Sequence, residues 1–365
     1  MQTVNVDHQT LPLEQPTDLF RPTSRSFELD DIDQAIEFYF EQGWTDGLPV
    51  VPPTPAKVSQ FLQAGGKYPG DIVGMIPERN RVITAEKVAI NAVMAGCMPD
   101  YMPVVIAAIE ALCQEAFNYH GSSASTGGSA PLVIVNGPVV AELGINSGGN
   151  CFGPGVRANA TIGRAVRLVM VNAGGTIPGI VDRSVLGHPG KYTFCIGEDE
   201  AGNPWQPLSM ERGIPAGTSA VTVFAAEAPH YVSSPASGEP FRLTEAISTN
   251  MLGTLYRSGC WVLVLCPEHV AVFKKAGWSK DDIRRAVQER TIRTVAGSKR
   301  LAGLPDQDIL PADEQTPFYY VPKLENLLIV TAGGMGNGIS AVIPPWVGGA
   351  SSMPVTRAVG VCIDC

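Results

Sequence analysis

Three uninterrupted apolar runs constrain the fold of this chain more than any other feature of its sequence. They read PLVIV at 131–135, WVLVL at 261–265 and LLIV at 327–330, and glycine or proline follows each run within three residues. A strand with one face in water alternates apolar and polar residues, so runs without alternation indicate strands buried on both faces. Helical patterns lie between the runs. The sequence therefore predicts an α/β fold, with ligands bound near the C-terminal ends of the strands.

Two of these runs lead into glycine-rich segments and suggest that the chain has two related halves. PLVIVNGP is followed by INSGGN, and NLLIVT is followed by AGGMGNG. A repeated order of helix, strand and glycine loop is typical of a weak internal duplication. We expect two loosely similar helix-strand-glycine-loop halves around mostly buried strands. The expected divisions are an N-terminal arm and first helix at 1–40, a first α/β half with a glycine-rich anion loop at 41–227, and a second α/β half ending in a Cys-x-x-Cys tail at 228–365.

Capping residues and prolines set the expected boundaries of the first elements. A helix is predicted over Asp31–Gln42, and a second helix, capped by Thr84, breaks at Met98-Pro99 and resumes over Tyr101–Gln114. Serine, glycine and threonine dominate 120–129, which predicts a loop. Residues 1–30 are polar and contain proline, so we expect an arm that wraps a neighbouring subunit or stays loose.

Charge and composition exclude several classes of partner. The formal net charge is −9 and the isoelectric point is about 5.1, and there is no run of basic residues, so we expect no nucleic acid as partner. No stretch of 18 apolar residues is free of charge and proline, so we expect no membrane span. The N-terminal segment lacks the apolar core of a secretory signal, which predicts a cytoplasmic protein with its eight cysteines mostly reduced. We also expect a homo-oligomer.

The densest group of candidate site residues lies in GINSGGNCFGPGVRANATIGRAVRLVMVNAGG at 144–175. A glycine loop that enters a helix presents backbone N–H groups and the positive end of the helix dipole to an anion. This pattern predicts a site for a carboxylate or phosphate. Alternatively, the glycines only make turns and the arginines pair with acids elsewhere. The pattern is neither GxGxxG nor a P-loop, so it implies no nucleotide. The candidate anion-binding residues are Ser147, Gly148, Gly149, Cys151, Arg157 and Arg164.

A second group of reactive side chains follows in GHPGKYTFCIGE at 187–198. His188 lies in a Gly-His-Pro turn, and Lys191 and Glu198 follow it within ten residues. His188 is therefore the best general-base candidate among the histidines, although most lone histidines are not catalytic. Lys191 is a candidate substrate ligand and Glu198 a candidate catalytic residue. His120 ranks second, and His269 looks like an ordinary helix-start residue.

Two cysteine positions suggest thiol chemistry. Cys97 lies where Met98-Pro99 breaks a helix, and freed backbone groups there are able to lower the pKa of a thiol; the alternative is a small buried hydrophobe. The chain ends in Cys362-Ile363-Asp364-Cys365. This spacing suits a redox pair, half of a metal site or no role at all, and the absence of a second Cys-x-x-Cys does not support a closed zinc site.

Several long phrases together resemble one family. They are GWTDGLPVVPPT, EKVAINAVMAGCMPDYMPVVIAAIEAL, FGPGVRANATIGRAVRLVMVNAGG, GHPGKYTFCIGE and PEHVAVFKKAGWSK. They look like the bacterial proteins of the UGSC (seleno)protein family, named for a selenocysteine- or cysteine-Gly-Ser-Cys motif, and the resemblance covers about residues 40–350. The naming motif is absent, because Ile363-Asp364 replaces Gly-Ser. The resemblance implies thiol chemistry and adds two residues, Asp46 and Asn159, to the candidate substrate-binding set.

Three functions are consistent with these patterns. The first is an enzyme that acts on a small anionic molecule, with Cys97, Cys362 or Cys365 as nucleophile or electron carrier and His188 moving protons. The second is a hydratase-type or lyase-type metalloenzyme that uses cysteines with His188 or Glu198 as ligands of a metal ion. The third is a non-catalytic subunit of an assembly, beside a companion thiol protein.

Overall fold

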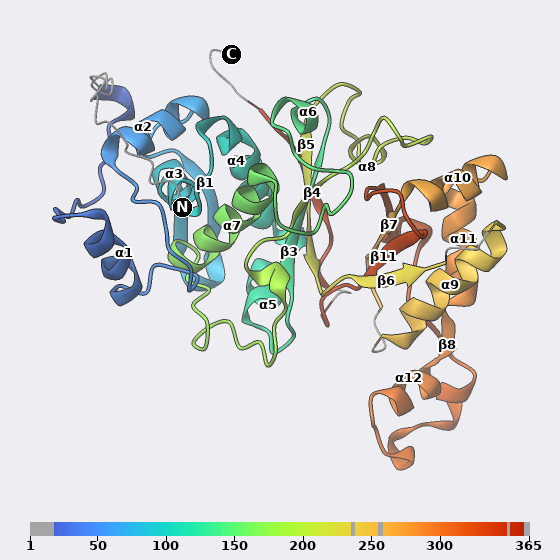
Figure 1. Cartoon of the computed structure of the whole chain (residues 1–365). Helices are drawn as coiled ribbons and strands as arrows, with labels where there is room; N and C mark the ends of the chain where they lie inside the picture. The colour runs from blue at the N-terminus through green and yellow to red at the C-terminus, as the bar shows by residue number, and fades with distance from the viewer. Residues whose placement is uncertain (1–17, 235–237, 255–257, 349–350, 361–365) are drawn as a thin grey trace, which may run out of the picture.

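The protein is described by a computed structural model, which defines residues 18–234, 238–254, 258–348 and 351–360. Four layers are stacked side by side in Figure 1: helices, a four-stranded sheet, a second four-stranded sheet, and helices again. The first sheet has the strand order β12 (Val355–Ala358), β5 (Ala220–Ala226), β3 (Ala130–Asn136), β4 (Cys195–Gly197). The second has the order β10 (Leu327–Thr331), β7 (Trp261–Leu265), β11 (Ile339–Ile343), β6 (His230–Ser233).

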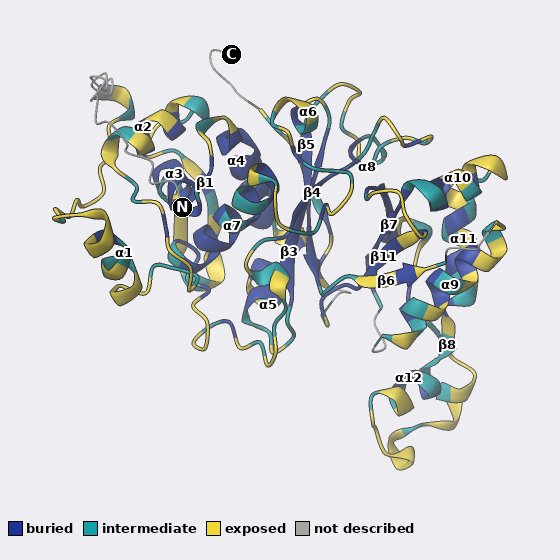
Figure 2. Ribbon diagram, in the orientation of Figure 1, coloured by how far each residue is buried: buried dark blue, intermediate teal, exposed yellow. Residues whose placement is uncertain are grey.

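The apolar runs form β3, β7 and β10, and each of these strands is buried on both faces as predicted. In β3, Leu132 and Ile134 pack in a core between the two sheets, whereas Val133 and Val135 pack against helices. Val264 of β7 contributes to the same core between the sheets. Because side chains alternate across a strand, two packed layers require apolar residues at every position. Figure 2 shows this as dark strands in the middle of the molecule and exposed residues at its ends.

Two groups of helices cover the outer faces of the sheets. The first group contains α2 (Pro55–Ala64), α3 (Ala85–Ala95), α4 (Met102–Leu112) and α7 (Arg157–Asn172). The second contains α9 (Pro240–Gly253), α10 (Pro267–Lys275) and α11 (Lys280–Arg290). The predicted cap is present on α3, where the Thr84 side chain accepts a hydrogen bond from Lys87 N. No helix in the described part of the chain combines the length and the apolarity needed to cross a bilayer.

Smaller elements complete the chain. They are α1 (Ile32–Glu41), α5 (Tyr119–Ala124), α6 (Val139–Glu142), α8 (Leu208–Glu211), α12 (Val295–Leu301), the hairpin β1 (Ile72–Ile76) with β2 (Arg81–Thr84), and the pair β8 (Ile292–Thr294) with β9 (Pro317–Tyr319).

The α/β class is confirmed, and the two sheets share one strand pattern. In each sheet two parallel strands, β3 with β4 or β7 with β10, are joined by an antiparallel third, β5 or β11. The fourth strand of each sheet is an edge strand. Strand β6 pairs with β11, inside the half 228–365, whereas β12 follows β11 but pairs with β5. The second half therefore contributes one edge strand to the first sheet, and β12 lies apart from the rest of 228–365.

One local prediction was wrong. The segment 120–129, expected to be a loop, begins inside α5, because the Asn118 side chain accepts from Gly121 N and caps a short helix. Around His188 the expected turn is present: Pro189–Lys191 form a 3₁₀ turn, and Cys195–Gly197 then join the sheet.

Candidate functional site

The glycine loops of the two halves meet each other. The first loop, residues 144–156, leads into α7, and the second loop, residues 332–338, follows β10. Gly148 and Gly333 form an isolated β-bridge, and Gly333 N donates to Ser147 O at 2.8 Å. The similarity between the two segments in the sequence therefore corresponds to a contact in space.

A cavity of about 370 Å³ lies between these loops and the second sheet. The first loop contributes Gly149 to Gly153, and the second contributes Gly333 to Gly336. The strands contribute Tyr231, Val264 and Ala341, which lie on the face of the sheet that is turned toward the first sheet. The volume is within the range of small-molecule sites, roughly 300–1,000 Å³. We take the glycine-loop cavity as the candidate functional site.

Two asparagines fix the first loop. The Asn146 side chain accepts from Gly148 N at 2.9 Å and donates to Gly149 O at 3.0 Å. Asn159, buried on α7, accepts from Asn146 N at 2.7 Å and donates to Asn146 O at 2.9 Å and Cys195 O at 3.1 Å. Asn159 was predicted to bind substrate. Its side-chain amide is instead hydrogen-bonded to the backbone, where it positions the loop.

Cys151 is the cysteine that the first loop brings to the cavity. It is buried, and burial raises the pKa of its thiol to about 11, although the backbone N–H groups of Cys151 and Phe152 oppose the shift. The thiol is therefore protonated at neutral pH. Tyr231 also lines the cavity, and its side chain is 69% exposed.

Two backbone N–H groups of the second loop lack an acceptor among the described residues. No described residue accepts a hydrogen bond from Gly334 N or Met335 N, and both residues line the cavity. Gly336 N donates to the Glu268 carboxylate, and this bond holds the pKa of Glu268 below its usual value. The lining residues include no lysine or arginine. Any anion must therefore be held by peptide dipoles, next to one existing negative charge.

The second loop rests on the N-terminal end of α10, where sequence reasoning assigned no role. His269 Nδ1 lies 2.7 Å from Ser340 Oγ, and Ser340 Oγ accepts from Cys266 N at 3.1 Å. The neighbouring Val342 packs on the helical side of the sheet, so alternation directs the Ser340 side chain away from the cavity. This cluster fixes β11 and the loop to the helix.

Arg157 and Cys97 lie together, but not at the cavity wall. The Arg157 guanidinium donates to Gly96 O at 2.9 Å and Cys97 O at 3.3 Å, which satisfies carbonyls at the C-terminal end of α3. Cys97 Sγ donates to Thr161 O at 3.3 Å, and burial raises the pKa of this thiol to about 12. The expected low-pKa thiolate is therefore opposed by burial, and Arg157 acts as a helix cap.

Arg164 and Asp46 form a nearly buried bidentate ion pair, with both N–O distances at 2.8 Å. The same guanidinium also donates to Leu48 O and Pro49 O. The GWTDGLP phrase is thus anchored on α7, and its aspartate neutralises the arginine expected to bind substrate.

Lys191 and His188 belong to another cluster, which does not line the cavity. Lys191 Nζ lies 2.8 Å from Asp182 Oδ2, and Arg167 lies 3.6 Å from the same oxygen. Burial lowers the pKa of His188, and the charges of Lys191 and Arg167 add to the shift. His188 Nδ1 accepts from Gly190 N at 3.1 Å, so this histidine shapes its own turn.

Glu198 is buried, and its carboxylate is engaged in hydrogen bonds that connect secondary-structure elements. It is 1% exposed and accepts from Asn136 at 2.7 Å, from Asn203 at 2.9 Å and from Leu208 N at 2.9 Å. Burial raises the pKa of its carboxyl. Its bonds join the C-terminal ends of β3 and β4 to the start of α8.

The candidate residues therefore divide among several places. Ser147, Gly148, Gly149 and Cys151 belong to the loop that bounds the cavity, whereas Cys97, His188 and Glu198 do not line it. Cys362 and Cys365 lie outside the described residues. Within the described ranges, no group of three or more His, Cys, Asp or Glu residues is arranged to hold a metal ion.

No protein-family model matches this chain, and no curated protein and no solved structure matches it. The resemblance to the UGSC family stays a prediction from the phrases quoted above.

Proposed function

We propose that this chain is a small-molecule enzyme in which Cys151 reacts with an anionic substrate bound between the two glycine loops. The supporting observation is the position of Cys151, a buried cysteine on the wall of the cavity where both loops meet. The proposal keeps the predicted thiol chemistry and transfers it from Cys97 to Cys151.

Substrate binding follows from the free N–H groups of Gly334 and Met335. Hydrogen bonds to a charged acceptor contribute about 1.5–3 kcal/mol each, so two of them are sufficient to select a small carboxylate. The Glu268 carboxylate on the neighbouring N–H disfavours substrates with several negative charges.

A thiol with a pKa of about 11 has little nucleophilic thiolate at neutral pH. The rate must therefore come from holding an electrophilic carbon of the substrate beside the sulfur, where effective molarities are large. We propose nucleophilic addition as the reaction class. Redox exchange with Cys362 and Cys365, or with a companion thiol protein, stays a prediction.

Competitive alkylation with iodoacetate and iodoacetamide tests the site. If the loops bind anions, the ratio of the iodoacetate rate to the iodoacetamide rate at Cys151 should exceed that of free cysteine by about tenfold, equivalent to ~1.4 kcal/mol. Peptide mass spectrometry measures both rates at each cysteine. The Cys151 rate should rise with pH toward about 11, because deprotonation is required.

Cys266→Ser is the matched control, because Cys266 is buried nearby and does not line the cavity. It should leave the ratio at Cys151 unchanged, and Cys151→Ser should remove the modified peptide. A Cys151 ratio equal to that of free cysteine would refute anion binding at this site.

The six cysteines of the described ranges are all free, which supports the proposed cytoplasmic location. The homo-oligomer stays a prediction.

A further inference from the structure

Helix α1 and the arm before it cover the first group of helices without packing tightly on them. Ile32, Phe38 and Tyr39 of α1 face a cavity of about 670 Å³, and only Ala35 of this helix is buried. The opposite wall consists of Val58 from α2 and residues of α3. Protein interiors are close-packed, so an opening of this size under an amphipathic helix requires an explanation.

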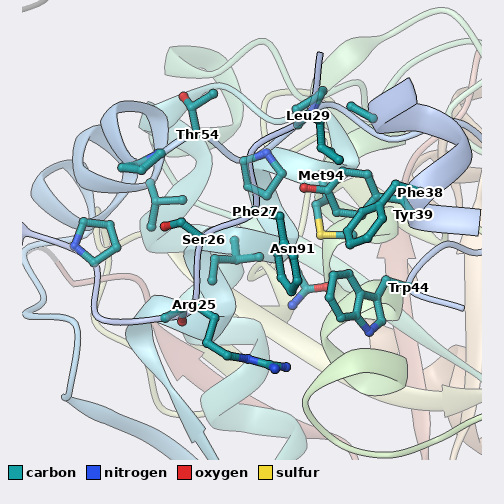
Figure 3. Close-up of a pocket in the computed structure, with 18 of the residues that line it drawn as sticks. Arg25, Ser26, Phe27, Leu29, Phe38, Tyr39, Trp44, Thr54, Asn91 and Met94 are labelled. Carbon is teal, nitrogen blue, oxygen red and sulfur yellow. The ribbon is translucent and has the colours of Figure 1, made fainter. Parts of the chain in front are cut away.

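The cavity has a stiff aromatic wall. Phe27, Phe38, Tyr39 and Trp44 contact one another, with ring centroids 5.0–6.0 Å apart. Figure 3 shows Phe38, Tyr39 and Met94 close together on one side of the pocket and Arg25 at its opposite end. Since the rings pack on each other, they form a surface and leave the space beside it open to another molecule.

The arm is held over this space by one buried carboxylate. Glu86 accepts from Thr23 N at 2.9 Å, Thr23 Oγ1 at 2.8 Å and Ser24 N at 2.8 Å. Both carboxylate oxygens of Glu86 therefore accept hydrogen bonds from the arm, one from two backbone N–H groups and the other from the Thr23 hydroxyl. The arm therefore acts as a strap across the cavity.

Charge on the lining argues for a neutral ligand. Glu86 and Asp31 are acids on the wall, and the Arg25 guanidinium lies over the Phe27 ring at 5.7 Å. The Glu86 and Asp31 carboxylates would repel an anionic ligand, and the Arg25 guanidinium would repel a cationic ligand. Trp44 Nε1–H has no hydrogen-bond acceptor among the described residues, so it is available to one oxygen atom of a ligand.

We infer that the cavity under α1 is a second binding site, which takes a neutral and largely apolar organic molecule with a hydroxyl or carbonyl oxygen. The volume fits the range of small-molecule sites, roughly 300–1,000 Å³. The ligand completes the packing between α1 and α3, with its oxygen accepting from Trp44 Nε1–H.

N-phenyl-1-naphthylamine, a neutral apolar fluorophore, tests this site on the full chain. Its fluorescence should rise and saturate at one probe per chain. 1-Decanol should displace it at lower concentration than decanoate or decylammonium. Equal displacement by the three compounds would overturn the neutral selectivity, and an absence of saturable binding would overturn the site.

Two variants fill the cavity from opposite walls. Ile90→Trp and Ala35→Phe should each weaken probe binding by at least about tenfold, which corresponds to ~1.4 kcal/mol. Glu37→Phe places the same new ring on an exposed position of α1 outside the cavity and should bind as the wild type does. Circular dichroism and thermal unfolding establish that each variant is folded.

The outcome is independent of the Cys151 site, because Cys151→Ser should retain full probe binding. If both filling variants are folded and bind with unchanged affinity, the inference is wrong. A dimer in sedimentation that excludes the probe would assign the cavity to a second copy instead and would also overturn it.

Discussion

The first glycine loop is held by amides, whereas the second is held by ionisable and hydroxyl groups at the end of a helix. Asn146 and Asn159 bind the first loop through its backbone, and no charged side chain takes part in those bonds. Glu268, His269 and Ser340 fix the second loop and its strand. The same order of elements has therefore been stabilised in two ways, and only the second depends on protonation.

The largest effect is expected when the amides of the first loop are removed. Asn159→Ala leaves Asn146 N, Asn146 O and Cys195 O without their partner, and buried groups without partners cost about 1–3 kcal/mol each. We expect a loss of about 4 kcal/mol in the free energy of unfolding. Urea denaturation measures it, with Thr161→Ala on the same helix as the control. A loss no larger than that of the control would show that the first loop keeps its conformation without the Asn159 amide.

Removing the side-chain hydrogen bonds that fix the second loop should reduce the free energy of unfolding by less. Ser340→Ala removes the acceptor of Cys266 N and the partner of His269, and we expect a loss of about 2 kcal/mol by urea denaturation. Thr331→Val is the control, because the buried Thr331 hydroxyl makes no hydrogen bond and its removal should cost little. Equal losses in the free energy of unfolding for Ser340→Ala and Asn159→Ala would show that side-chain hydrogen bonds stabilise the two loops to the same extent.

The contact between the loops is tested at one glycine. A methyl group on Gly334 would lie 2.8 Å from Gly149 Cα, whereas one on Gly148 would lie 3.6 Å from its nearest neighbour. Gly334→Ala should therefore separate the loops, cost about 1–2 kcal/mol and abolish the iodoacetate preference at Cys151. Gly148→Ala should retain the preference. Loss of the preference in both variants would show that the loop backbone, not the contact, is responsible.

The smallest effect is a pH dependence. Burial lowers the pKa of both His188 and His269 from 6.5, so the unfolded chain binds protons more readily than the folded chain. Stability should therefore fall as the pH drops below about 6.5 and change little through these groups above it. His188→Gln should reduce the slope of melting temperature against pH, and His230→Gln, at an exposed position, is the control. An unchanged slope in His188→Gln would contradict the prediction.

Local signals in the sequence were sufficient for the strands and caps, because those depend on neighbouring residues. The apolar runs became β3, β7 and β10, and Thr84 caps α3. The partners of charged groups were not predictable, because Asp46 pairs with Arg164 across 118 residues. Burial could not be predicted from the sequence either. The Met98-Pro99 break indicated an activated thiol at Cys97, but the fold buries this side chain.

The similarity between the two glycine segments was the signal that located the cavity. It predicted related halves, but not that their loops would touch, since contact depends on how the sheets stack. Tyr231 and the free N–H groups of Gly334 and Met335 have no motif of their own, so only the coordinates identify them.

The pairing of β12 with β5 has a consequence for biosynthesis. The edge of β5 that faces away from β3 receives its partner only from residues 355–358, more than a hundred positions later in the chain. Until those residues leave the ribosome, the first sheet keeps an open edge that is able to pair with foreign strands. Translation must therefore run nearly through the whole chain before the first sheet is complete. A protein cut between β5 and β6 would keep all four strands of the second sheet in its C-terminal piece, whereas its N-terminal piece would lack β12.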